Sequence, residues 1–148
     1  MSSAREFFSA QEQEDIRQAI MNAELDTSGE IRIHIEDEVK GDVMDRAAFL
    51  FGKLGMTRTE LRNGVLIYLA VKNRRFAILG DSGINRVVPD NFWDDVKALM
   101  LKHFRENRFT DGLVEAIGAS GKLLKKHFPR SQNDVNELPD DISFGQGS

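Results

Sequence analysis

Apolar residues recur with helical spacing in four segments of the chain. The first helix is expected to follow Ser9, because Ser9 and Glu12 have the spacing of a capping box. The other three segments have apolar residues three or four positions apart, which is typical of helices that bury one face. They span residues 43–54, 90–106 and 110–128. The pattern therefore predicts four amphipathic helices.

Three shorter segments have the patterns of strands. Residues 30–36 alternate between isoleucine and polar residues, which predicts a half-exposed strand near an edge of the sheet. Residues 65–71 are continuously apolar, and this predicts a central strand that is buried on both faces. The polar connection 72–75 leads to the apolar residues 76–79, so the second and third strands should form a hairpin.

The order of these elements predicts the fold class and the position of a candidate site. A helix, a strand, a helix, a hairpin and two helices favour an α/β fold, with a small mixed sheet and helices on both faces. If the first two strands are parallel, their N-terminal ends lie at one edge of the sheet. The third strand returns to that edge at Gly80 and Asp81. Three loops that are distant in the sequence should therefore converge.

Composition and charge divide the chain into two parts. The 148 residues carry a net charge of −4, and residues 130–148 contain one arginine against four acidic residues, or −3. Residues 1–129 therefore carry only −1 (−4 minus −3), which argues against a general nucleic-acid binder. We expect a single domain over residues 1–129, followed by an acidic, disordered tail over residues 130–148.

Two absences in the sequence narrow the function further. The chain contains no cysteine, which excludes thiolate catalysis and zinc sites built from cysteine. Charged residues occupy the N-terminus where a signal peptide needs an apolar segment, and the longest unbroken apolar run is residues 65–71. These features predict a cytoplasmic protein that does not insert into a membrane.

The converging loops carry side chains that suit a hard cation. Glu30, Asn63 and Asp81 offer oxygen donors at this edge, and oxygen ligands favour Ca²⁺ or Mg²⁺ over zinc or copper. Ca²⁺ is the better candidate, because it accepts carbonyl and amide oxygens in flexible geometry. Arg62 beside them could hold an anionic substrate. The alternative is that these are ordinary turn and surface residues.

Two other patterns are weaker candidates for chemistry. Asp90 and Asp94 fall one turn apart near the start of a predicted helix, where carboxylates also stabilise the helix dipole without any ligand. Ser82 follows Asp81 in a Gly-Asp-Ser-Gly sequence, but such a short match does not indicate a serine hydrolase. No candidate base is adjacent in the sequence: the histidines are His34, His103 and His127.

Five short motifs, in this order, give the chain a resemblance to the TPM domain family. They are Ser28-Gly29-Glu30-Ile31, Arg62-Asn63-Gly64-Val65-Leu66-Ile67-Tyr68, Gly80-Asp81-Ser82-Gly83-Ile84, Phe92-Trp93 and Phe109-Thr110-Asp111-Gly112-Leu113. The resemblance covers roughly residues 5–129, and the ordered set is more specific than any one motif. It implies a three-layer α/β/α sandwich around a mixed sheet. It also implies calcium binding and acid phosphatase activity, with which related domains are associated.

Three functional hypotheses follow. In the first, the chain binds a divalent cation through the carboxylates of Glu30, Asp81 and Asp111, with Asn63 as a neighbouring oxygen donor; the resemblance supplies Asp111. Ca²⁺ is favoured, and Mg²⁺ is the other candidate. In the second, the bound cation assists hydrolysis of a phosphate ester, with Asp81 and Arg62 as catalytic candidates. In the third, the chain is a non-enzymatic module that engages a protein partner through its tail or its sheet edge.

Overall fold

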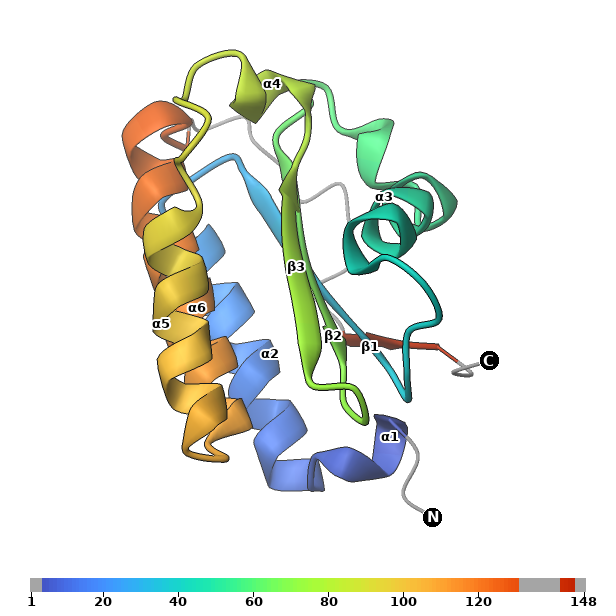
Figure 1. Ribbon diagram of the computed structural model, residues 1–148. Coiled ribbons are helices and arrows are strands. Elements are labelled where there is room, and N and C mark those ends of the chain that lie inside the picture. The colour runs from blue at the N-terminus through green and yellow to red at the C-terminus, as the bar shows by residue number, and fades with distance from the viewer. Residues whose placement is uncertain (1–3, 131–141, 146–148) are drawn as a thin grey trace.

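A mixed sheet of four strands, in the order β3-β2-β1-β4, forms the centre of the fold (Figure 1). The computed structural model describes residues 4–130 and 142–145. β2 is parallel to β1 and antiparallel to β3, and β4 is parallel to β1. The strands are β1 (Glu30–Glu36), β2 (Gly64–Ala70), β3 (Arg75–Gly80) and β4 (Ile142–Phe144).

Helices cover both faces of this sheet, so the expected three-layer α/β/α arrangement is confirmed (Figure 1). Three long helices lie on one face, and one helix with a short 3₁₀ turn lies on the other. Among the described residues, no helix is both long enough and apolar enough to span a bilayer. The three helices on the first face are α2 (Ala10–Glu24), α5 (Asp94–Arg105) and α6 (Phe109–His127). The second face has α3 (Val43–Lys53) and η1 (Met56–Arg58), and the short helices are α1 (Ala4–Phe7) and α4 (Ser82–Asn85).

The continuously apolar strand β2 divides its side chains between two cores. Val65, Ile67 and Leu69 belong to the core under α2, α5 and α6. Leu66 and Tyr68 alternate with them and belong to the core under α3. Every residue of β2 is buried, as predicted for a central strand.

β1 differs from its prediction as a half-exposed strand near an edge. All of its residues are buried except Arg32, which is partly exposed. The apolar face carries Ile31, Ile33 and Ile35 as expected. On the polar face, Arg46 from α3 and Tyr68 from β2 contact Glu36, and β4 takes the edge position beside β1. The alternating pattern was predicted correctly, but His34 and Glu36 on its polar side are buried and pair with protein groups.

β4 lies within the residues that were expected to form a disordered tail. Ile142 is 5% exposed and joins the main core, and the β4 residues pair with Ile33, His34 and Ile35 of β1. Gly145 follows directly, and a side chain there would overlap the carboxylate of Glu36. The tail prediction therefore fails for these residues, because a three-residue strand is too short to show a period. The rest of the expected tail, residues 131–141 and 146–148, lies outside the described residues.

Burial of Ile142 leads to a direct test of β4. Ile142→Ala should lower the free energy of unfolding by about 2–4 kcal/mol, because it empties a core position. Leu25→Ala is the matched control, since Leu25 is 66% exposed and its loss should change stability by less than about 0.5 kcal/mol. Urea unfolding followed by circular dichroism measures both. Equal stabilities of Ile142→Ala and the unmodified chain would mean that β4 does not contribute to the fold.

Candidate functional site

Strand register brings together the residues that the sequence placed at one edge of the sheet. Glu30 is paired with Gly64 across β1 and β2, and Val65 is paired with Gly80 across β2 and β3. The predicted convergence of the strand ends is thereby confirmed. We call the four polar residues at this edge the strand-end cluster: Glu30, Arg62, Asn63 and Asp81. The two carboxylates and the amide are buried, at 2–5% exposure, whereas the Arg62 side chain is 46% exposed.

Arg62 and Asp81 form a two-pronged ion pair at the centre of this cluster. Arg62 donates from Nε to Oδ2 of Asp81 at 2.8 Å and from Nη2 to Oδ1 at 3.0 Å. The backbone N–H of Ser82 also donates to Oδ1, at 2.7 Å. These hydrogen bonds to Asp81 raise the pKa of Arg62. The parallel geometry makes this a directional pair, which fixes both side chains relative to each other.

The backbone around Arg62 is held in an unusual conformation. Its φ angle is +52°, in the left-handed region that non-glycine residues seldom adopt. Arg62 N–H donates to the Thr59 carbonyl at 3.2 Å, and Gly83 N–H donates to the Arg62 carbonyl at 2.8 Å. A side chain at Gly83 would overlap the Leu61 carbonyl oxygen, so only glycine allows α4 to start this close to the loop. The fold therefore holds a locally strained residue where the guanidinium meets Asp81.

Asn63 joins the beginnings of β1 and β2. Its backbone carbonyl accepts from Glu30 N–H at 3.3 Å, and its side-chain Nδ2 donates to Ser28 Oγ at 3.2 Å. Its own N–H donates to Thr59 Oγ1 at 3.2 Å. With Nδ2 used in this way, the amide oxygen Oδ1 is the acceptor that Asn63 can offer to a ligand.

Asp111, the fourth residue in the predicted ligand set, lies elsewhere. The C-terminal end of α6 is the end near β1, since Phe128 accepts from Ser28 N–H at 2.9 Å and Leu124 packs on Gly29. Asp111 is in the first turn of α6, about 24 Å along the helix axis from His127. The structure therefore brings three of the four predicted ligands together and leaves Asp111 apart. Within residues 4–130 and 142–145, no group of three or more His, Cys, Asp or Glu side chains could hold a metal ion.

Comparison with known proteins now identifies the family. The family model described as the TPM domain matches residues 2–123, which is most of the chain. The chain belongs to the TPM domain family. No curated protein matches this TPM domain.

Solved structures agree with this assignment. The TPM domain is 47% identical to the BA42 protein from the psychrophilic bacterium Bizionia argentinensis, with a TM-score of 0.91; the match covers 98% of this chain and 100% of that one. Two more distant structures share the fold. The N-terminal domain of a P. gingivalis protein is 20% identical with a TM-score of 0.68, covering 82% of this chain and 78% of that one. The N-terminal domain of the Corynebacterium glutamicum protein cg2496 is 12% identical with a TM-score of 0.65, covering 88% and 82%.

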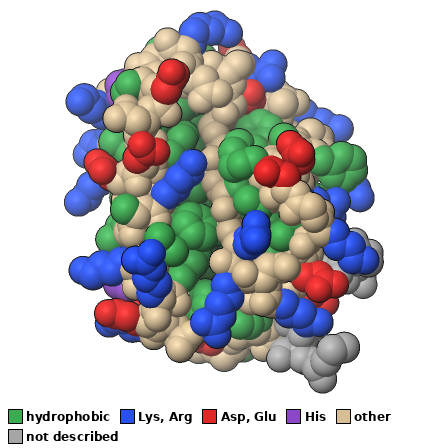
Figure 2. Space-filling view, viewed as in Figure 1, with side chains coloured by type: hydrophobic (Ala, Val, Ile, Leu, Met, Phe, Trp, Pro, Cys, Tyr) green, Lys and Arg blue, Asp and Glu red, His purple; other side chains and the backbone are tan. Residues whose placement is uncertain are grey.

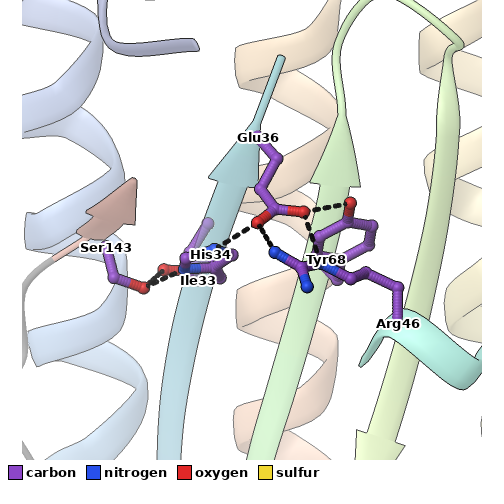
Figure 3. A network of polar contacts seen from close by, with 6 residues as sticks. All are labelled: Ile33, His34, Glu36, Arg46, Tyr68 and Ser143. Carbon is purple, nitrogen blue, oxygen red and sulfur yellow. Dashed lines mark hydrogen bonds and ion pairs between the residues drawn. The ribbon is translucent and has the colours of Figure 1, made fainter. Parts of the chain in front are cut away.

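The TPM domain also contains a buried polar network at the other end of β1, which the sequence did not reveal (Figure 3). Glu36 is its centre: it accepts from Arg46 Nε at 2.9 Å and from the Tyr68 hydroxyl at 2.7 Å, and its Oε2 lies 3.3 Å from His34 Nε2. His34 Nδ1 lies 2.7 Å from Ser143 Oγ. The network therefore joins β1, β2, α3 and β4. The alternation in the sequence predicts that His34 and Glu36 face solvent, whereas both are buried.

Electrostatics explain why these groups can be buried. Burial by itself raises the pKa of Glu36, but hydrogen bonds from Arg46, Tyr68 and His34 outweigh it and lower that pKa to about 2. Burial lowers the pKa of His34, and contact with Glu36 opposes this only in part. Burial and the hydrogen bond to Glu36 both raise the pKa of Tyr68. At neutral pH the network therefore holds an ionised glutamate, a neutral histidine and a protonated tyrosine.

Charged side chains on the surface of the domain are arranged differently from those in the Glu36 network. On the face seen in Figure 2, basic and acidic side chains are interspersed over the surface. In the Glu36 network, by contrast, one carboxylate receives every donor around it. The buried carboxylate is therefore stabilised by specific partners inside the sandwich.

The lowered pKa values predict how stability depends on pH. A carboxyl with a folded pKa of about 2, against 4.5 as its ordinary value, stabilises the fold above pH 4.5, and this is lost as the pH falls toward 2. The loss from Glu36 amounts to about 3 kcal/mol. His34 also lowers the stability of the fold as the pH falls below 6.5, because its pKa is lower in the folded chain than in the unfolded chain. The unfolded chain therefore binds the proton at a higher pH than the folded chain does.

Glu36→Gln should reduce stability at pH 7 and flatten the decline between pH 4.5 and pH 2, because it removes the titrating carboxyl. Urea unfolding at a series of pH values measures this slope. Glu14→Gln is the control, since the Glu14 side chain is 61% exposed and should leave the slope unchanged. The same slope in Glu36→Gln and in the unmodified chain would contradict the assignment.

Proposed function

We propose that this TPM domain binds a divalent cation at the strand-end cluster, with Ca²⁺ favoured over Mg²⁺. What supports the proposal is one observation: oxygen-bearing side chains from three separate segments, Glu30, Asn63 and Asp81, meet at one edge of the sheet, next to glycine-containing turns. Two carboxylates, an amide oxygen and nearby backbone carbonyls are oxygen ligands only, which suits a hard cation. A set with only two carboxylates favours Ca²⁺, because Ca²⁺ readily takes carbonyl and water ligands as well.

Asp111 is not part of this proposed ligand set, because it lies in the first turn of α6. The proposal therefore differs from the sequence hypothesis in one residue. This difference supplies a matched control, since one aspartate, Asp81, lies in the strand-end cluster and the other, Asp111, lies in the first turn of α6.

Arg62 is a competitor for the cation. Its guanidinium occupies both carboxylate oxygens of Asp81, so a cation has to displace it from at least one of them. The Arg62 side chain is 46% exposed whereas Asp81 is buried, so the guanidinium can move into solvent while the cation takes its place at the carboxylate. Once displaced, Arg62 is a positive group beside a bound cation, where an anionic ligand would meet both charges.

Ca²⁺ should raise the melting temperature of the unmodified chain and change its tryptophan fluorescence. Stabilisation follows because the folded state alone presents the assembled donors. Trp93 is the only tryptophan, is buried, and lies against Gly80, next to Asp81. Asp81→Asn should weaken binding at least about tenfold, whereas Asp111→Asn should leave it unchanged.

Isothermal titration with Ca²⁺ and Mg²⁺ provides the affinity for each variant. Arg62→Gln should bind Ca²⁺ more tightly than the unmodified chain, because it removes the competing guanidinium. The absence of heat and of any melting shift with both cations would refute the proposal. Loss of binding in Asp111→Asn, with Asp81→Asn unaffected, would refute this choice of ligands.

A second candidate function is metal-assisted hydrolysis of a phosphate ester at the same cluster. The exposed guanidinium of Arg62 favours it, because arginine is well suited to a phosphate group next to a cation. The cation would neutralise phosphate charge and activate a water molecule. Arg62 would hold the phosphate oxygens, and Asp81 would keep the cation and the phosphate at a fixed separation.

Turnover of p-nitrophenyl phosphate in the presence of Ca²⁺ or Mg²⁺ tests this second function. Arg62→Ala should lower kcat/KM about a hundredfold, as expected for the loss of a charged donor to the reacting group. Arg86→Ala is the control, since Arg86 is an exposed arginine in the turn that follows α4. Metal-dependent turnover that persists in both Arg62→Ala and Asp81→Ala would place the activity elsewhere.

A further inference from the structure

A groove with a volume of about 730 Å³ lies between α2 and α6, and Asp111 lines it. No residue of the strand-end cluster is among its lining residues. The two helices run parallel. At their N-terminal ends Thr110 Oγ1 donates to Glu12 Oε2 at 2.8 Å, and near their C-terminal ends a Cβ at Gly121 would lie 2.8 Å from that of Ala23. Between these two contacts the groove stays open to solvent.

Small residues form the base of this groove. Gly118 is the informative one, because a Cβ built there meets no atom within 4 Å and its φ angle is not left-handed. Neither close packing nor backbone conformation requires glycine at this position, although glycine inside a helix is about 1 kcal/mol less favourable than alanine. Its effect is to keep the middle of the groove open. The other small or apolar residues at the base are Ala19, Ala23, Val114 and Gly121.

The two ends of the groove carry opposite charges. Asp15 and Asp111 lie at the end formed by the N-termini of both helices, and Lys122 and Lys125 lie at the C-terminal end. Asp111 and Lys125 are separated by about 21 Å along α6. Asp26 also lines the C-terminal end and lies 3.7 Å from Lys125, but both side chains are more than 60% exposed, so this pair is weak. The two lysines leave this end with a net positive charge.

We propose that the groove binds an amphipathic helix of a partner protein, antiparallel to α2 and α6. An ordinary helix carries acidic residues in its first turn and basic residues in its last turn. Laid antiparallel, its acidic turn meets Lys122 and Lys125 and its basic turn meets Asp15 and Asp111. The groove volume divided by the length of about 21 Å between Asp111 and Lys125 gives a cross-section of roughly 35 Å². A cross-section of this size admits one row of apolar side chains from such a helix.

Other occupants fit this surface less well. A second copy of the chain in antiparallel orientation would match the charges, but it would set one groove over the other and fill neither. An acyl chain with an acidic headgroup would meet the lysines and leave Asp15 and Asp111 against an apolar tail. A partner helix places apolar side chains on the base of the groove and opposite charges at both of its ends.

Two designed peptides of about four helical turns test the proposal on the full chain. Both carry one row of leucines; the first has glutamates in its first turn and lysines in its last, and the second has these charges exchanged. Fluorescence anisotropy of the labelled peptides gives affinity, and ¹H–¹⁵N spectra locate the contact. We expect the first peptide to bind at least about tenfold more tightly than the second, with shifts at the groove residues.

Variants of the chain make the test specific. Gly118→Leu fills the groove and should weaken binding of the first peptide at least about tenfold, while its helix stays folded because leucine is the better helix former. Gly52→Leu is the control, since a Cβ at Gly52 in α3 also meets no atom within 4 Å and lies outside the groove. The double variant Asp111→Lys, Lys122→Glu leaves one acidic and one basic residue of this set at each end, because Asp15 and Lys125 are unchanged. It should therefore abolish the preference between the two peptides.

The outcomes separate clearly. Binding of neither peptide at millimolar concentration overturns the proposal, and so does equal binding of both, which would indicate contact without the expected orientation. Shifts confined to residues outside the groove would also overturn it. None of these measurements depends on a divalent cation, so they do not bear on the proposed function of the strand-end cluster.

Discussion

Complete burial of β2 is the constraint on which the rest of the structure depends. Its side chains point alternately into two cores, so each face needs its own cover. A sheet covered on both sides gives three layers, and the parallel crossover through α3 fixes the register of β1 against β2. That register, together with the β2–β3 hairpin, sets which loops meet at the edge. The strand-end cluster therefore exists because a strand in the middle of the sheet is apolar on both faces.

The polar network around Glu36 shows how the same fold accommodates charge in its interior. The α3 face of β1 would be an unfavourable place for a carboxylate if the donors were missing. Arg46 from α3 and Tyr68 from β2 supply them, and the α3 layer is thereby attached to the sheet by ionic as well as apolar contacts. Arg62 and Asp81 form a comparable pair at the opposite end, where the arginine is more exposed, at 46% against 33% for Arg46. The proposed cation site rests on the more exposed of these two pairs.

The sequence predicted the layers, the strand order through β1, β2 and β3, and the meeting of three strand ends, because these depend on periodicity and on chain connectivity. It did not predict β4, since three residues carry no period, and it assigned the polar side of β1 to solvent because alternation does not say what covers a face. Asp111 was grouped with the strand ends through a family resemblance, without knowledge of the direction of α6. The helix predicted to begin at Asp90 is α5, which begins at Asp94, and residues 90–93 before it form a non-helical turn. Side-chain partners and the course of helices depend on tertiary packing, and no single-sequence pattern encodes them.

β4 has a consequence for the way the chain is made. The contact between His34 and Ser143 joins residues 109 positions apart, and β4 lies after every other described element in the sequence. During synthesis from the N-terminus, β1 and β2 are complete long before β4 emerges. Until then β1 presents an isoleucine-rich edge with unpaired backbone groups, the kind of edge that pairs with strands of other chains. The edge of β1 stays open until β4 pairs with it. The chain is therefore most prone to aggregation between the synthesis of β1 and the docking of β4.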